Sequence, residues 1–232
     1  MSAKTSNNGF VFPLWIKSDS PELELKANSP SNNKRRFNFS IPFLDSIATK
    51  LELQTDETTH LPRGLTGEVI FQYIYAVLFS PSYRSRYSEF LKGDFPRIPL
   101  TQHQELFHSL SELGHELIKL HLLESANLSL EICIFTGDNV GKVEKSSWSK
   151  NTVWIDIAQS TGFTGVSEEV WNFHVGGYQV CEKWLKDRKG RKLSREDVLQ
   201  YRKIIASLSK TIVLMADIDK VIQQYGSWPD AF

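Results

Sequence analysis

A run of cations in the last third of this chain has the residue types and spacing to bind an anionic ligand. Between residues 183 and 192, only Asp187 opposes it. Its members are Lys183, Lys186, Arg188, Lys189, Arg191 and Lys192. Lysine and arginine neutralise phosphates and release the counterions condensed on them, so this run suits a phosphate-rich ligand. Two glycines shortly before it, Gly176 and Gly177, let the backbone approach a ligand closely.

The element that must position these cations is expected to be one or two turns of helix. Its apolar side chains are Tyr178, Val180, Cys181, Trp184 and Leu185. These side chains are expected to hold the helix on the core, so that its charged side faces outward. Two interpretations stay open. The cations either end a solvated amphipathic helix, where they suit the helix dipole, or they touch DNA or a neighbouring domain.

Three arginines elsewhere form a second, weaker set of candidate DNA contacts. They are Arg84, Arg86 and Arg97, and the first two are expected on the outward side of a short helix. The basic run Lys34–Arg36 is interpreted as the end of a solvated loop. Contacts to bases are expected from loops in the region Gly137–Gly165. The polar residues suited to them are Asn139, Lys142, Lys145, Lys150 and Asn151.

The composition describes a globular protein whose charge is balanced overall. The chain has 232 residues, 41% of them hydrophobic, and a formal net charge of zero. Nucleic-acid binding would therefore depend on local patches rather than on a global field. Two cysteines, Cys133 and Cys181, make no disulfide framework and indicate a reducing compartment. With no apolar run of about 20 residues and no signal peptide, a soluble cytoplasmic protein is predicted.

The patterning predicts an α+β fold with two long packed helices and a small antiparallel sheet. The expected helices are Ile41–Leu53, Thr66–Phe79, a short one that begins at Ser82, Thr101–Leu123 and Arg195–Tyr225. The segment Gly9–Ile16 is apolar enough for a buried strand, although Pro13 indicates an edge or a bulge. The other expected strands are Leu130–Phe135 and Asn151–Ile157, with Thr161–Val166 as a loop. We expect a disordered lead at 1–9 and one domain over 10–232, with a mobile loop at 17–36.

Neither a metal nor a cofactor is expected. The helix Thr101–Leu123 has a seam of leucines spaced by three and four, which is typical of core packing. None of its histidines pairs with another at the i, i+4 spacing of a helical zinc site, so we predict that they face solvent or cap helices. They are His103, His108, His115 and His121.

Catalytic motifs are missing, so no enzymatic activity is expected from this chain. The segment Thr136–Lys142 looks like a phosphate-binding loop, but its glycines are too close together and Val143 stands where Ser or Thr is needed. The sequence has no GxGxxG, GxSxG, CxxC or HExxH. The Asn-Pro-Pro-aromatic motif of amino-methylating DNA methyltransferases is also absent.

Three long segments resemble the C-terminal specificity domain of Type ISP restriction–modification enzymes. They are VIFQYIYAVLFSPSYRSRYSEFLKGDFPRIPL (Val69–Leu100), LFHSLSELGHELIKLHLLE (Leu106–Glu124) and EEVWNFHVGGYQVCEKWLKDRKGRKLSREDVLQYRKIIASL (Glu168–Leu208). The resemblance covers about Phe10–Ile222. These enzymes join a nuclease, a translocating ATPase, an N6-adenine methyltransferase and a target-recognition domain in one polypeptide.

The resemblance implies sequence-specific recognition of double-stranded DNA beside a methyltransferase or translocase partner. That partner would supply the catalysis that this chain lacks. The alternative is a protein-interaction module that docks a methyltransferase or translocase subunit. The apolar surface of Thr66–Phe79 and the zero net charge favour this alternative.

Overall fold

The computed structural model describes residues 11–17, 35–126, 128–137 and 141–232. The expected lead at 1–9 and most of the expected loop at 17–36 lie outside the described residues. The helices are α1 (Ile41–Lys50), α2 (Gly67–Phe79), α3 (Pro81–Arg86), α4 (Ser88–Gly93), α5 (Gln104–His121), α6 (Glu168–Trp171), α7 (Val180–Lys186) and α8 (Arg195–Gln224). The strands are β1 (Trp15–Lys17), β2 (Arg35–Phe37), β3 (Ile134–Thr136), β4 (Ser147–Ser149), β5 (Thr152–Trp154), β6 (Gly162–Thr164), β7 (His174–Val175) and β8 (Tyr178–Gln179).

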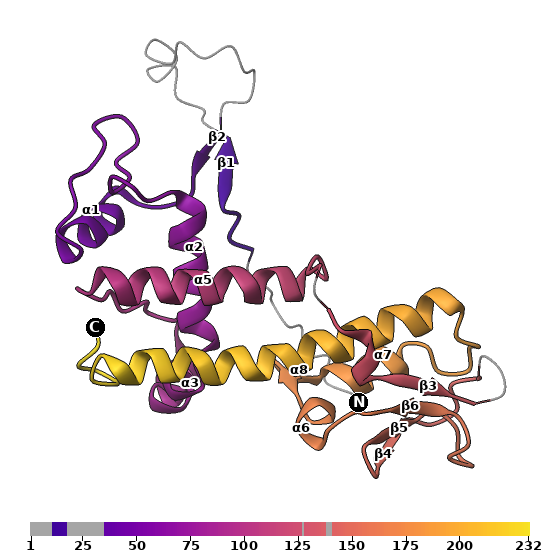
Figure 1. Cartoon of the computed structure of the whole chain (residues 1–232). Coiled ribbons are helices and arrows are strands. Elements are labelled where there is room, and N and C mark those ends of the chain that lie inside the picture. The colour runs from indigo at the N-terminus through magenta and orange to yellow at the C-terminus, as the bar shows by residue number, and fades with distance from the viewer. Residues whose placement is uncertain (1–10, 18–34, 127, 138–140) are drawn as a thin grey trace.

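The predicted α+β class and the pair of long packed helices are confirmed. Helices α5 and α8 contact each other along the C-terminal half of α8, and α2 packs against both of them (Figure 1). At the crossing of α2 and α5, a Cβ added to Gly114 would lie 1.9 Å from the carbonyl oxygen of Gln72. The glycine therefore sets how closely these two helices approach.

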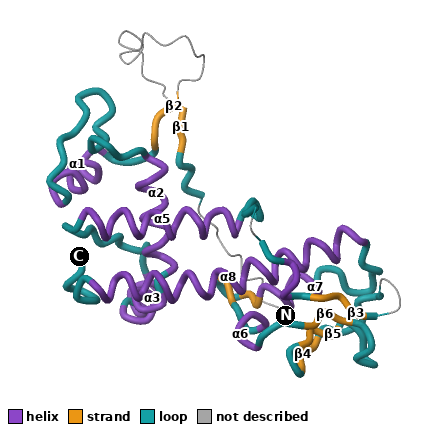
Figure 2. Tube along the Cα trace, viewed as in Figure 1, coloured by secondary structure: helices purple, strands orange, loops and turns teal. Residues whose placement is uncertain are grey.

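Helix α8 joins two separate clusters of buried apolar side chains. Its C-terminal half places Ile218 and Ile222 among side chains of α1, α2, α3 and α5. Its N-terminal half places Tyr201 and Ile205 against the sheet, α6 and α7. The sheet therefore lies at the end of α8 that is opposite the chain's C-terminus (Figure 2).

The sheet is four-stranded and antiparallel, in the order β3-β6-β5-β4. A tight turn joins β4 to β5, and its residues Lys150 and Asn151 both have positive φ angles. The prediction that Thr161–Val166 is a loop is wrong. Gly162–Thr164 forms the inner strand β6, whose Phe163 is fully buried. Gly162 and Gly165 are typical of a loop in sequence, but pairing with β3 and β5 satisfies the backbone hydrogen bonds of this segment.

The prediction that the strand near the N-terminus is buried is wrong, whereas the edge position indicated by Pro13 agrees with the two-stranded sheet. Strand β1 pairs only with β2, and Val11, Phe12 and Trp15 are 87%, 68% and 41% exposed. The pair forms a two-stranded ribbon that projects beyond the N-terminal end of α2 (Figure 1). Trp15 stacks on Phe37, and Phe37 covers Gly67 at the start of α2.

The helices begin mostly where their capping residues predict. Thr66, Ser167 and Ser194 each accept a hydrogen bond from the backbone N–H three residues later. The short helix after α2 differs, because Ser80 rather than Ser82 caps α3. Phe90 in α4 is 75% exposed.

Candidate nucleic-acid interface

The segment Gly176–Lys192, called the basic stretch below, begins as part of a β-hairpin rather than as a helix. Gly176 and Gly177 form the turn between β7 and β8, and Tyr178 lies in β8. Tyr178 is 53% exposed, so it does not help to hold the following helix on the core as predicted. That task falls to Cys181 and Leu185 of α7, which are fully buried. Helix α7 is therefore seated as the apolar pattern predicts, but it begins at Val180.

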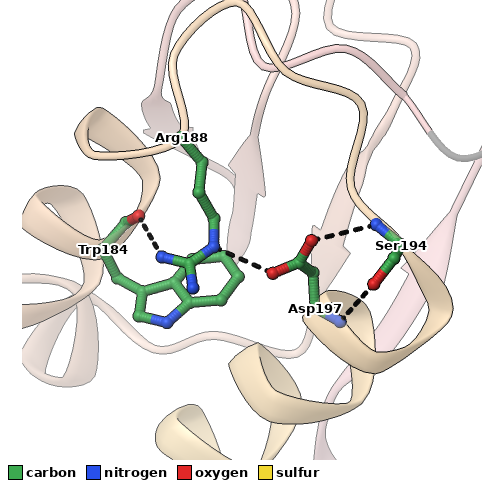
Figure 3. Close-up of polar contacts among 4 residues, drawn as sticks. All are labelled: Trp184, Arg188, Ser194 and Asp197. Carbon is green, nitrogen blue, oxygen red and sulfur yellow. Dashed lines mark hydrogen bonds and ion pairs between the residues drawn. The ribbon is translucent and has the colours of Figure 1, made fainter.

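Arg188 is bound by protein groups on three sides (Figure 3). Its guanidinium carbon lies 3.5 Å from the ring centroid of Trp184, and Nη1 donates a 3.2 Å hydrogen bond to the Trp184 carbonyl. Its Nε donates to Oδ1 of Asp197 at 3.0 Å. The Arg188 side chain is 21% exposed. Arg188 thus ties the end of the basic stretch to α8.

Asp197 receives this contact while it also caps α8. Its side chain accepts from the Ser194 N–H, and the Ser194 hydroxyl accepts from the Asp197 N–H (Figure 3). The Ser194 N–H and, next, the Arg188 guanidinium hold the pKa of Asp197 below its usual range. Ser194 and Asp197 therefore form a capping box at the start of α8, with Arg188 as an additional partner.

Two further cations of the stretch form exposed ion pairs within α7. Lys183 lies 2.5 Å from Oδ1 of Asp187, and Lys186 lies 2.8 Å from Oε2 of Glu182. Exposed pairs one helical turn apart contribute only about 0.3–0.5 kcal/mol. These lysines are held weakly enough for a phosphate to compete with the carboxylates.

Three cations of the stretch are exposed and form no ion pair with any residue that the structure describes. They are Lys189, Arg191 and Lys192, in the connection between α7 and α8. The backbone of this connection is fixed, because the Gly190 N–H donates to the Val143 carbonyl at 2.7 Å and the Val143 N–H donates to the Arg191 carbonyl at 2.9 Å. The cations therefore project from an ordered backbone beside the sheet.

The second set of arginines lies far from this connection. Arg84 was expected to point outward, but its Nε donates a 2.5 Å hydrogen bond to the Leu78 carbonyl and its guanidinium lies over Phe79. Burial lowers its pKa, although Arg84 remains charged near neutral pH. Arg86 and Arg97 are exposed. Helix α3 contacts Asp219 of α8, about six helical turns or roughly 33 Å from Asp197.

A family comparison decides what kind of domain this is. A model of the Type ISP C-terminal specificity domain matches residues 1–217. The chain belongs to this family. The match begins nine residues before the resemblance inferred from the sequence motifs and includes the stretch Gly176–Lys192.

The fold of this specificity domain is similar to parts of much longer proteins of known structure. One is the ATP-dependent Type ISP restriction-modification enzyme LlaBIII bound to DNA, with a TM-score of 0.57 and 17% identity over 89% of this chain and 13% of that chain. Another is a DrdV–DNA complex, with a TM-score of 0.60 and 20% identity over 81% of this chain and 20% of that chain. The specificity domain thus spans a small fraction of those proteins. No curated protein sequence matches it.

Two histidines of α5, His115 and His121, form side-chain hydrogen bonds within the specificity domain. No group of three or more His, Cys, Asp or Glu side chains suited to a metal occurs among the described residues. His115 contacts Gln72, and His121 lies between Tyr75 and Thr211. The prediction that the histidines are solvent-facing or capping is therefore wrong for His121.

Within the described residues, no helix is long and apolar enough to cross a membrane.

Two basic surfaces of the specificity domain were not predicted from the sequence. Lys142, considered only as a base contact, pairs with Lys192 in an isolated antiparallel bridge. Arg35 and Arg36, assigned to a loop, lie in β2 opposite Lys17 and Ile16. A long intervening segment separates β1 from β2 in the sequence, so no local spacing indicated that the two would pair.

Proposed function

We propose that this specificity domain recognises DNA targets within a Type ISP restriction–modification system and has no catalytic site of its own. Family membership supports the assignment to target recognition. The observation that carries the DNA contact is the α7–α8 connection, where Lys189, Arg191 and Lys192 are exposed and form no described ion pair. In that system, an N6-adenine methyltransferase part and a translocase part of the assembly would carry the chemistry.

The α7–α8 connection suits contact with phosphates because its ends are fixed before a ligand arrives. Arg188 joins α7 to the first turn of α8, and the connection pairs with residues 141–143 beside the sheet. A pre-ordered loop loses less conformational entropy on binding. Phosphate contacts set the position and register of a protein on DNA but carry no direct sequence information. Base reading is therefore assigned to the sheet loops, including the exposed turn at Lys150 and Asn151.

Burial of both cysteine thiols makes them unsuited to act as nucleophiles, in agreement with a domain that has no catalytic cysteine. Cys133 and Cys181 are fully buried, and burial raises the pKa of each thiol to about 12. A thiol with so high a pKa is almost entirely protonated near neutral pH, and the thiolate is the nucleophilic form. Both side chains therefore act as small apolar groups of the core.

Fluorescence anisotropy with labelled duplex DNA over a series of NaCl concentrations tests this proposal. We expect binding that weakens as salt rises. Replacing Lys189, Arg191 and Lys192 with glutamine should make the slope of log K against log salt less negative by about 2–3, because each lost phosphate contact removes about 0.9. A matched triple replacement of exposed cations on the helical part, at Lys50, Lys92 and Lys220, should leave the slope unchanged.

Two outcomes contradict parts of this proposal. If the wild-type domain binds no duplex at low salt, alone or with a Type ISP methyltransferase–translocase chain, the DNA-binding function is wrong. If it binds but both triple variants behave like the wild type, the DNA contact lies elsewhere. Competition among duplexes of different sequence then measures target specificity.

A second candidate function is docking to the methyltransferase or translocase part. In the sequence, the apolar surface of Thr66–Phe79 favoured docking. In the structure, α5 and α8 cover most of this surface. A different surface favours docking: an aromatic groove of about 320 Å³ between α3–α4 and the connector to α5. Its lining includes Phe90 and Phe95, which are 75% and 55% exposed. Co-expression with a methyltransferase–translocase chain, compared with Phe90→Ser, tests this function without DNA.

A further inference from the structure

We infer that Lys142 and Lys192 together form one binding site for a phosphate of the DNA backbone. This inference rests on the proposed DNA-binding function and adds a residue outside the basic stretch to it. The two lysines are far apart in sequence, but an antiparallel bridge places them opposite each other. Lys142 precedes the sheet strands β4 and β5, and Lys192 ends the basic stretch.

The backbone hydrogen bonds fix which kind of cross-strand pair the lysines form. The Val143 N–H donates to the Arg191 carbonyl at 2.9 Å, and the Leu193 N–H donates to the Gly141 carbonyl at 3.3 Å. These bonds flank the lysines, so Lys142 and Lys192 are a pair without hydrogen bonds between them. In such a pair the Cα atoms are only about 4.5 Å apart, and the side chains are closer than in the other type of pair.

The neighbouring residues fix the direction of both lysine side chains. Val143 and Leu193 are each 1% exposed and point into the core beside the sheet. Because successive side chains of an extended segment point to opposite sides, Lys142 and Lys192 point together toward solvent. Both lysines are exposed. The alternation thus brings two ammonium groups to the same face of the protein.

Two cations held directly opposite each other repel, and neither lysine forms an ion pair with any residue that the structure describes. Like charges in this position destabilise a strand pair. Glu144, on the same side of the segment as Lys142, instead accepts a 3.3 Å hydrogen bond from the Ile157 N–H. An anion bound between the two ammonium groups would relieve the repulsion. The fold therefore holds a site that gains stability when a phosphate arrives.

The chemistry of the pair favours a backbone phosphate over a base. Lysine ammonium groups are point charges on flexible stems and lack the planar fork with which arginine reads guanine. Charge-assisted hydrogen bonds from two ammonium groups can reach two oxygens of one phosphodiester. Lys189 and Arg191 lie in the same connection as Lys192 and would extend the contact along the strand. The pair should thus contribute affinity and register without sequence preference.

Thermal unfolding without DNA tests the pairing of the two lysines. At low ionic strength, Lys142→Gln and Lys192→Gln should each raise the Tm by about 1–2 °C because the repulsion is removed. The double variant should gain no more than either single variant, and the gain should shrink in 0.5 M NaCl. A lowered Tm in both single variants, or gains that simply add, would overturn the pairing.

Anisotropy with a 30-base-pair duplex tests the ligand. Lys142→Gln with Lys192→Gln should weaken binding by about tenfold at 100 mM NaCl and reduce the salt slope by 1–2, with unchanged discrimination between duplex sequences. The control is Lys50→Gln with Lys220→Gln, two exposed lysines of the helical part. Wild-type binding that the lysine-pair variant retains in full overturns this inference and leaves the proposed function intact. A wild-type domain that binds no duplex overturns both.

Discussion

Arg188 forms a 3.0 Å ion pair with Asp197 and so joins the end of α7 to the first turn of α8. The two side chains are only 21% and 16% exposed, in contrast to the exposed lysine pairs of α7. The run of six cations therefore contains three kinds of residue, because Lys183 and Lys186 form the exposed ion pairs. Arg188 holds the backbone in place, and Lys189, Arg191 and Lys192 project from it.

Replacing Arg188 with alanine should destabilise the domain by about 1–3 kcal/mol. The change removes the cation–π contact with Trp184, worth about 0.5–2 kcal/mol, and leaves Asp197 without its charged partner. Arg188→Lys should recover only part of the loss, because an ammonium cannot stack and donate as a planar guanidinium does. Urea denaturation monitored by circular dichroism measures both changes.

The neighbouring Lys189→Ala is the matched control for Arg188→Ala. Lys189 is exposed and forms no ion pair with the described residues, so its replacement should change the unfolding free energy by less than about 0.5 kcal/mol. Equal losses in the two variants would show that Arg188 does not have the structural role assigned to it.

The stability of the domain should fall as the pH drops below about 6.5, in part because of His121. Thr211 donates its hydroxyl hydrogen to the Ser207 carbonyl and so accepts from Nε2–H of His121, while Tyr75 donates to Nδ1. Burial and, next, the charge of Arg84 lower the pKa of His121 from its ordinary value of 6.5. The unfolded chain therefore binds a proton at a higher pH than the folded chain does, and acid favours unfolding.

Denaturation of His121→Gln at pH 7 and pH 5 isolates this contribution. Glutamine keeps a donor for Thr211 but does not titrate. The loss of stability between the two pH values should be smaller in the variant than in the wild type. A variant whose stability falls as steeply as that of the wild type would rule out His121 as a source of the pH dependence.

Gly114→Ala should destabilise the domain by about 2 kcal/mol or more. Helix propensity alone favours alanine by about 1 kcal/mol, but the new Cβ would lie 1.9 Å from the Gln72 carbonyl and force α2 and α5 apart. Gly93→Ala is the control, because nothing lies within 4 Å of its added Cβ. Urea denaturation should show a loss for Gly114→Ala only, and an unchanged Gly114→Ala would mean that the two helices are not in this close contact.

Asp219→Ala should destabilise the contact between α3 and α8 by about 1–3 kcal/mol. The carboxylate accepts from the Ser80 hydroxyl at 2.5 Å, the Ser82 hydroxyl at 2.7 Å and the Ser82 N–H at 2.9 Å. Its loss leaves donors at the start of α3 without their partner. Asp217→Ala, which removes only an exposed pair with Lys220, should cost less than about 1 kcal/mol. Hydrogen exchange should show faster exchange of the Ser82 amide only in Asp219→Ala.

Features that depend on neighbouring residues could be predicted from the sequence. Thr66, Ser167 and Ser194 cap helices through groups three residues away. The spacing of apolar residues predicted α5 and α8 and the face on which each packs. In each case the interacting groups lie within one helical turn, so residue type and spacing are sufficient.

Features that depend on distant segments could be seen only in the folded protein. Strand β6 looks like a loop until β3 and β5 pair with it, and Arg84 turns inward because a carbonyl and an aromatic ring lie within its reach. Lys142 and Lys192 become neighbours because buried Val143 and Leu193 align their segments. Backbone pairing and burial join groups that no local spacing connects, so the basic surface is composed by the fold.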